Sequence, residues 1–72
     1  MLQILFFGNL KEVLKKESLT IKYEEEMILA DVVKHLGISP PFLCAVNQAI
    51  APVSTLLKDG DEIAFMPPFS GG

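Results

Sequence analysis

Residues 62–72 read Glu62-Ile63-Ala64-Phe65-Met66-Pro67-Pro68-Phe69-Ser70-Gly71-Gly72, and this stretch decides the fold. Its first five residues predict a buried strand, with Ile63 and Phe65 on the core face. The two prolines that follow fix the backbone φ and favour the extended polyproline conformation. The sequence therefore predicts a strand of a rigid sheet that continues into a thin arm held away from the body.

The arm is predicted to be a flexible tail, residues 67–72, on a domain formed by residues 1–66. The four residues from Phe69 to Gly72 span roughly 13 Å when extended, and glycine passes where only a backbone fits. We expect Gly72 to carry a free carboxylate, which the tail delivers into a pocket of another protein. A frayed terminus without function is the simpler alternative. The pairing of Gly71 and Gly72 with two prolines favours the functional interpretation.

The composition restricts the classes of protein to consider. A chain of 72 residues forms one domain of marginal stability, and half of its residues are hydrophobic, which suggests that a partner covers apolar surface. The net charge is −3 and the six lysines are scattered, which disfavours binding to nucleic acid or to an anionic membrane. The sequence shows no apolar run long enough to span a bilayer and no signal peptide. Cys44 is the only cysteine, so no internal disulfide can form, and we expect a cytoplasmic protein.

Hydrophobic periodicity predicts seven elements in the order β-α-β-α-β-β-β. Asn9 is predicted to cap the first helix, with Glu12 as its partner in a capping box, and Gly37 to end the second helix. The run Glu24–Glu26 suits the positive end of the second helix dipole. The predicted elements are strand 2–7, helix 10–16, strand 19–23, helix 28–36, strand 42–46, strand 49–50 and strand 62–66.

Alternation within the strands and the helical stripe predicts one core. One mixed sheet covered on one side by a helix gives an α+β fold, with the first and last strands as parallel central neighbours. The core is predicted to consist of Leu2, Ile4, Phe6, Leu19, Ile21, Tyr23, Ile63 and Phe65, packed against Leu29, Val32, Val33 and Leu36.

Strand parity also predicts an apolar patch on the outer face of the sheet. Gln3 marks the outer face of the first strand, which places Phe7 outside. Glu62 marks the outer face of the last strand, which places Met66 outside, where the tail departs. Large apolar groups collected on a polar face usually indicate an interface.

Three motifs carry a resemblance to the small subunit of molybdopterin synthase. They are Phe6-Phe7 at the end of the first strand, Val46-Asn47-Gln48, and residues 59–72, which run from Asp-Gly-Asp-Glu into Pro-Pro-Phe-Ser-Gly-Gly. The resemblance covers the whole chain, and the C-terminal third is its specific part. It implies the ubiquitin-like β-grasp fold, which agrees with the predicted element order.

The resemblance also implies a sulfur carrier. An adenylating enzyme related to the ubiquitin-activating type would use ATP to adenylate Gly72, and a sulfur donor would convert the adenylate into a thiocarboxylate. The large synthase subunit would accept the tail within a heterotetramer, supply the catalytic acid and base, and pass the sulfur to cyclic pyranopterin monophosphate in molybdenum cofactor biosynthesis. The chain itself is expected to bind no cofactor or metal. The residues expected to contact the large subunit are Phe7, Ile50, Met66, Pro67, Pro68, Phe69 and Ser70, with Gly71 and Gly72 at the reaction site.

Other functional classes remain open at this point. The chain could be a sulfur carrier of the thiamine pathway, although that family usually lacks the two prolines before its glycines. It could also be a modifier joined to lysines of target proteins, or an interaction module with an inert terminus. Cys44 is expected to be a buried core thiol and His35 a solvated helix residue, because neither has a catalytic partner in the sequence.

Overall fold

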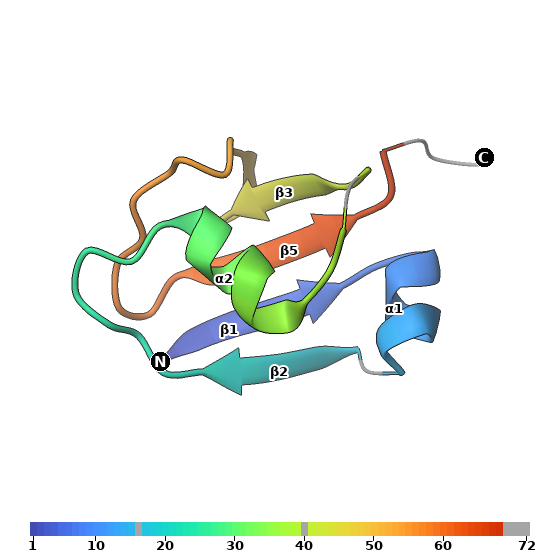
Figure 1. The fold of residues 1–72 in the computed structure, drawn as a ribbon, viewed down its shortest axis with the longest axis horizontal. Coiled ribbons are helices and arrows are strands. Elements are labelled where there is room, and N and C mark those ends of the chain that lie inside the picture. Colours follow the sequence, from blue (N-terminus) through green and yellow to red (C-terminus); the bar gives the residue numbers. More distant parts are fainter. Residues whose placement is uncertain (16, 40, 69–72) are drawn as a thin grey trace.

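The computed structural model describes residues 1–15, 17–39 and 41–68, and it shows one sheet with a helix lying across it (Figure 1). The order of the elements is the predicted one. The elements are β1 (Leu2–Phe6), α1 (Asn9–Leu14), β2 (Ser18–Ile21), α2 (Leu29–Leu36), β3 (Leu43–Val46), β4 (Ala49–Ile50) and β5 (Glu62–Met66).

The sheet has the strand order β2-β1-β5-β3-β4. Its central pair, β1 and β5, is parallel, with Gln3 opposite Glu62 and Phe6 opposite Phe65. The pairs β1–β2, β3–β5 and β3–β4 are antiparallel. The predictions of a mixed sheet and of parallel central neighbours are therefore confirmed.

The core lies between the sheet and α2. Leu29 and Val32 on α2 are fully buried, and so are Ile63 and Phe65 on β5. Burial of each such side chain contributes about 1.5–3 kcal/mol, so this layer supplies most of the stabilisation available to a small domain. The buried cluster consists of Leu2, Ile4, Phe6, Ile21, Leu29, Val32, Cys44, Leu57, Ile63 and Phe65.

The aromatic rings in this cluster pack around Phe65. The ring of Phe6 stacks on it with 6.2 Å between centroids, and Phe42 meets it edge-on at 5.6 Å. Two residues predicted for the core, Leu19 and Tyr23, are only half-buried and pack at its margin.

The predicted start and end of the first helix are wrong. Gly8, with φ 61°, occupies the N-cap position and the helix begins at Asn9, so Asn9 is not the N-cap residue that was predicted. The helix ends at Leu14 because Lys15 adopts the left-handed conformation, with φ 57°. Lys16, the last residue of the predicted helix, lies outside the described residues.

Several strand boundaries differ by a residue or two. β1 ends at Phe6 and β3 begins at Leu43, each one residue short of the prediction. β2 begins one residue early, at Ser18, and ends at Ile21, because Ile21 pairs with Leu2, the first residue of β1. Tyr23 lies beyond this ladder, and its hydroxyl donates to the backbone carbonyl of Leu57 at 3.4 Å.

The second helix begins at Leu29, after the acidic run as predicted and one residue later than the predicted start. Asp31 caps the helix, because its carboxylate accepts from the backbone N–H of Ile28 at 2.9 Å. Gly37 ends the helix in the left-handed conformation, as predicted. Neither described helix is long and apolar enough to cross a membrane.

The β3–β4 turn is strained at one position. Asn47 and Gln48 both have positive φ, 51° and 71°, as the two-residue hairpin turn requires. Asparagine tolerates this conformation, whereas glutamine has no local hydrogen bond to offset the clash of its Cβ.

We expect Gln48→Gly to raise the free energy of unfolding by about 0.5–1 kcal/mol, because glycine removes the Cβ clash at a small cost in chain entropy. Chemical denaturation measures the difference. Gln3→Gly is the matched control: Gln3 is exposed in the extended strand β1, so the same substitution should destabilise the domain there. An unchanged or lower stability for Gln48→Gly would contradict the prediction.

Candidate functional site

The parallel pairing of β1 and β5 brings the ends of both strands to one end of the sheet, beside α1 (Figure 1). Phe7 directly follows β1, and its backbone N–H donates to the carbonyl of Phe65 at 3.0 Å. Phe7 is thereby held next to Met66, the last residue of β5. The predicted proximity of these two residues is confirmed.

An apolar groove covers the face of the sheet opposite α2. Its volume is about 700 Å³, and its walls come from β1, β3, β4 and β5 and the turn residue before β4. Phe7 is 49% exposed and Ile50 is 67% exposed, so the large side chains of the groove meet solvent. The residues that line the apolar groove are Leu5, Phe7, Ala45, Gln48, Ile50, Glu62, Ala64 and Met66.

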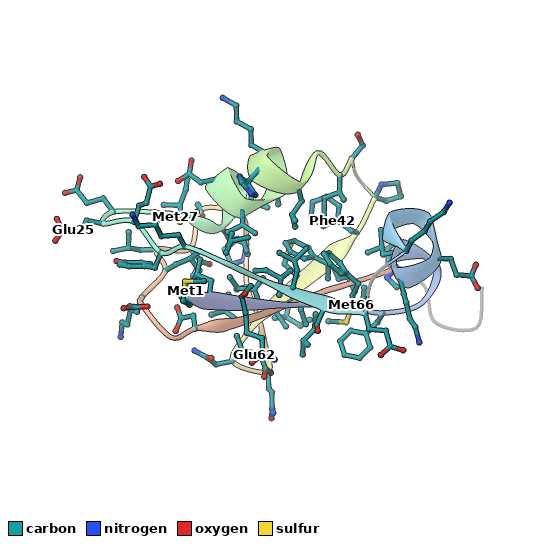
Figure 2. All side chains as sticks on the ribbon, turned by 90° about the horizontal axis from the view of Figure 1, so that it is seen from below. Met1, Glu25, Met27, Phe42, Glu62 and Met66 are labelled. Atoms are coloured by element: carbon teal, nitrogen blue, oxygen red, sulfur yellow. The ribbon has the colours of Figure 1, made fainter. Side chains whose placement is uncertain are left out.

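Strand alternation explains why the groove and the core occupy opposite faces. On β5, Ile63 and Phe65 are 0% exposed, whereas Glu62, Ala64 and Met66 between and beside them are half-exposed. Figure 2 shows Glu62 and Met66 on the side of the sheet away from α2. A groove of this size with one charged wall residue, Glu62, has the character of an interaction surface.

The chain leaves the sheet at Pro67, directly beside the groove. Pro67 and Pro68 are half-buried, and the ring of Pro67 packs against Gly8. A Cβ at Gly8 would lie 2.6 Å from Cγ of Pro67, so the absence of a side chain at Gly8 permits this contact. Gly8 therefore helps to set the direction in which the chain departs, a role that no local sequence pattern indicated.

The predicted reactive tail itself lies outside the described residues. This applies to Phe69, Ser70, Gly71 and Gly72. Of the residues predicted for the partner surface, the structure gathers Phe7, Ile50 and Met66 into the apolar groove and places Pro67 and Pro68 at its end.

A hydrogen-bonded lock, formed by the side chains of Asn47 and Asp61, was also missed by sequence reasoning. Asn47 Nδ2 donates to Asp61 Oδ1 at 2.9 Å, and Asn47 Oδ1 accepts from the backbone N–H of Glu62 at 3.0 Å. Asp61 is only 8% exposed, and its second oxygen accepts from the backbone N–H of Lys58 at 2.8 Å. Both residues lie in motifs that the sequence made visible, Val46-Asn47-Gln48 and Asp59-Gly60-Asp61. No local pattern predicted that the two motifs would be hydrogen-bonded to each other.

An exposed ion pair lies at the margin of the groove. Lys11 and Glu17 are 2.8 Å apart and line a second hollow of about 510 Å³, which shares Leu5 and Phe7 with the apolar groove. The hydrogen bond to Glu17 raises the pKa of Lys11, and the same bond lowers the pKa of Glu17. Both groups are fully exposed, so the pair adds charge to this margin but little stability.

Residues 4–72 match the ThiS family, which is nearly the whole chain. The chain belongs to the ThiS family. One relative, the molybdopterin synthase sulfur carrier subunit of Haemophilus influenzae, is 34% identical over 83 aligned residues, which cover 100% of each chain. This family assignment agrees with the resemblance that the sequence motifs indicated.

Solved structures extend the comparison to the fold of this ThiS family member. SAMP1 from Haloferax volcanii superimposes with a TM-score of 0.84 at 20% identity, over 99% of this chain and 98% of that chain. A complex of subunits 1 and 2 of the molybdopterin-converting factor from Helicobacter pylori matches with a TM-score of 0.63 at 29% identity, over 99% and 97%. These matches and the sheet topology confirm the predicted ubiquitin-like β-grasp fold.

The described part of this ThiS family chain contains no group of three or more His, Cys, Asp and Glu side chains that could hold a metal ion. Cys44 is buried in the core, and burial raises the pKa of its thiol, which keeps it protonated and a poor nucleophile. His35 is exposed on the last turn of α2, away from the groove.

Under the function proposed in the next subsection, we expect Cys44→Ala and His35→Gln to retain sulfur transfer, because neither side chain lies in the apolar groove. Cys44→Ala should lower the melting temperature slightly, since it removes a buried atom, and His35→Gln should not. Transfer assays and thermal melts of both variants test this. A large loss of transfer in a folded variant would reveal a site that the groove does not include.

Proposed function

We propose that the chain is the sulfur carrier subunit of a molybdopterin synthase, and that Gly72 is the residue that carries the sulfur. The observation that carries the proposal is the apolar groove beside Pro67, where the Gly-Gly arm leaves the sheet. The name of the H. influenzae relative and the two-subunit complex from H. pylori support the same function.

The large synthase subunit is the proposed occupant of the groove. Phe7, Ile50 and Met66 supply the large apolar side chains there, and burying them would anchor the complex. Because Met66 immediately precedes Pro67, docking at the groove fixes the starting point of the arm. Phe69 and Ser70 would then contact the large subunit on the way to its active site.

Loading of the carrier requires activation of the carboxylate. An oxygen of the Gly72 carboxylate attacks the α-phosphorus of ATP on an adenylating enzyme, and pyrophosphate leaves. A sulfur nucleophile at the oxidation level of sulfide then attacks the carbonyl carbon, the C–O bond to AMP breaks, and the thiocarboxylate forms. Such a covalent intermediate divides one difficult substitution into two easier steps.

Transfer uses the thiocarboxylate as a nucleophile. Its sulfur attacks an oxygen-bearing carbon of cyclic pyranopterin monophosphate, and the C–O bond at that carbon breaks as the oxygen leaves with a proton from the large subunit. Water then cleaves the acyl–sulfur bond. The sulfur stays on the substrate and the Gly72 carboxylate is regenerated. The large subunit supplies the acid and base for these steps, so this chain acts as the sulfur-donating subunit of a cytoplasmic sulfurtransferase.

Intact mass spectrometry tests the proposal. The protein is incubated with an adenylating enzyme, ATP and a sulfur donor, and then with the large subunit and the pyranopterin substrate. We expect exchange of one oxygen for sulfur at the terminus, which reverses when the substrate is added. Isopeptide-linked products would identify a protein modifier, and an unchanged mass would identify an inert module. A thiocarboxylate that the large subunit does not consume would point to the thiamine pathway.

A further inference from the structure

Few backbone hydrogen bonds hold the wall of the apolar groove that β4 forms. β4 has two residues and pairs only with β3, through Ala45–Ile50 and Val46–Ala49. One further hydrogen bond, from the backbone N–H of Ala51 to the carbonyl of Cys44 at 3.0 Å, follows it. β4 is a two-residue edge strand with β3 as its one neighbour in the sheet, so its orientation depends on what holds the turn before it.

The turn is held by the lock between Asn47 and Asp61. The backbone N–H of Asn47 donates to the carbonyl of Glu62 at 2.7 Å, and its side chain makes the two further bonds described above. These bonds tie the first turn residue to the beginning of β5. The second turn residue, Gln48, has φ 71°, the left-handed conformation that the two-residue turn requires.

We propose that Asn47, held by Asp61, is a positioning residue that fixes Ile50 and Gln48 as one wall of the groove. Ile50 is 67% exposed, and within the sheet its backbone pairs with Ala45 of β3 at the end of the short β4 ladder. Its position relative to Phe7 and Met66 on the central strands is therefore set through the turn. Asn47 acts on partner binding through Ile50, without lying in the groove itself. The inference rests on the proposed function only for the identity of the partner.

The geometry allows a swap experiment. In Asn47→Asp, two carboxylates face each other at the 2.9 Å contact, and no ammonium group among the described residues forms an ion pair with Asp61. In the double variant Asn47→Asp with Asp61→Asn, the amide and the carboxylate exchange places. Each bond of the lock then has a donor and an acceptor again: residue 61 donates to residue 47 and accepts from Lys58, and residue 47 accepts from Glu62.

Calorimetric titration with the large subunit provides the main readout. We expect Asn47→Asp to weaken binding about fivefold and the double swap to restore it within about twofold, as for the loss and recovery of one polar contact. In an Ile50→Ala background, Asn47→Asp should change the affinity by less than about twofold, because the group through which it acts is gone. The amide hydrogen of Ala51 should exchange faster in Asn47→Asp than in the wild type, and its rate should return to the wild-type value in the double variant.

Three results would overturn the inference. They are unchanged binding by Asn47→Asp, an equal loss in the Ile50→Ala background, and a swap that does not restore binding. If Asn47→Asp unfolds while the swap folds, the lock serves the whole domain, which also rejects a specific role at the groove. Failure of the wild-type protein to bind the large subunit would instead reject the proposed function, and exchange at Ala51 would still decide whether the lock holds β4.

Discussion

Removal of Gly72 is expected to abolish sulfur transfer while leaving the melting temperature unchanged. Under the proposed function the reactive carbon is the last one of the chain, so a shorter arm presents a carboxylate one residue too early. A misplacement of about 1 Å can cost a hundredfold in rate, and one extended residue spans more than three times that distance. We therefore expect a loss of at least about a hundredfold.

Appending one residue after Gly72 should have the same effect, because it moves the carboxylate beyond the site. Gly71→Val should also fail, since a β-branched side chain widens and stiffens the arm. Binding to the large subunit is the control. All three variants keep the apolar groove, so titration should show nearly the wild-type affinity while transfer is lost. Retained transfer in the shortened or extended variant would contradict the assignment of Gly72.

The second large effect is expected at the groove. Phe7→Lys and Met66→Lys should each weaken the complex with the large subunit by more than about 1 kcal/mol, because the complex would bury an ammonium group in an apolar contact. The isolated domain should stay folded, because both side chains lie on the face opposite the core. Calorimetric titration and a thermal melt of each variant give the two quantities.

Leu56→Lys is the matched control for these variants. Leu56 is 63% exposed, as apolar as the groove residues, and lies outside the groove in the segment that bridges to Ile28. It should leave the affinity unchanged. An equal loss of affinity in Leu56→Lys would show that any added positive charge weakens the complex. A melt that collapses in Phe7→Lys without the partner would place Phe7 in the core.

Much of the fold followed from local patterns. Alternation along β5 separated Ile63 and Phe65 from Glu62 and Met66, because successive side chains of a strand point to opposite faces. The spacing of Leu29 and Val32 identified the buried side of α2 in the same way, since helical periodicity is a property of a few consecutive residues. Gly37 and the turn at Asn47 were also recognisable, because their backbone conformations favour particular residue types.

The predicted ends of helices and strands were wrong where contacts with distant parts of the chain determine them. α1 begins after Gly8, whose conformation goes with a contact to Pro67 at the other end of the sequence. β2 ends early because Ile21 lies opposite Leu2, where the partner strand β1 begins. Sequence periodicity contains no information about these partners, so boundaries predicted from it were displaced by one or two residues.

The candidate site likewise combines features that the local sequence predicts with features that depend on residues far apart in the chain. The sequence by itself predicted a thin, extended tail, because the two prolines fix the backbone φ and the two glycines carry no side chain. The sulfur chemistry expected of that tail came from the resemblance to the molybdopterin synthase small subunit. The sequence also determined which residues of each strand face outward. Strand parity also predicted that Phe7 and Met66 lie together, whereas only the tertiary structure showed that Ile50 lines the same groove and that Asn47 is hydrogen-bonded to Asp61. The register of hydrogen bonds between strands sets those distances, and that register depends on the packing of the whole sheet against α2.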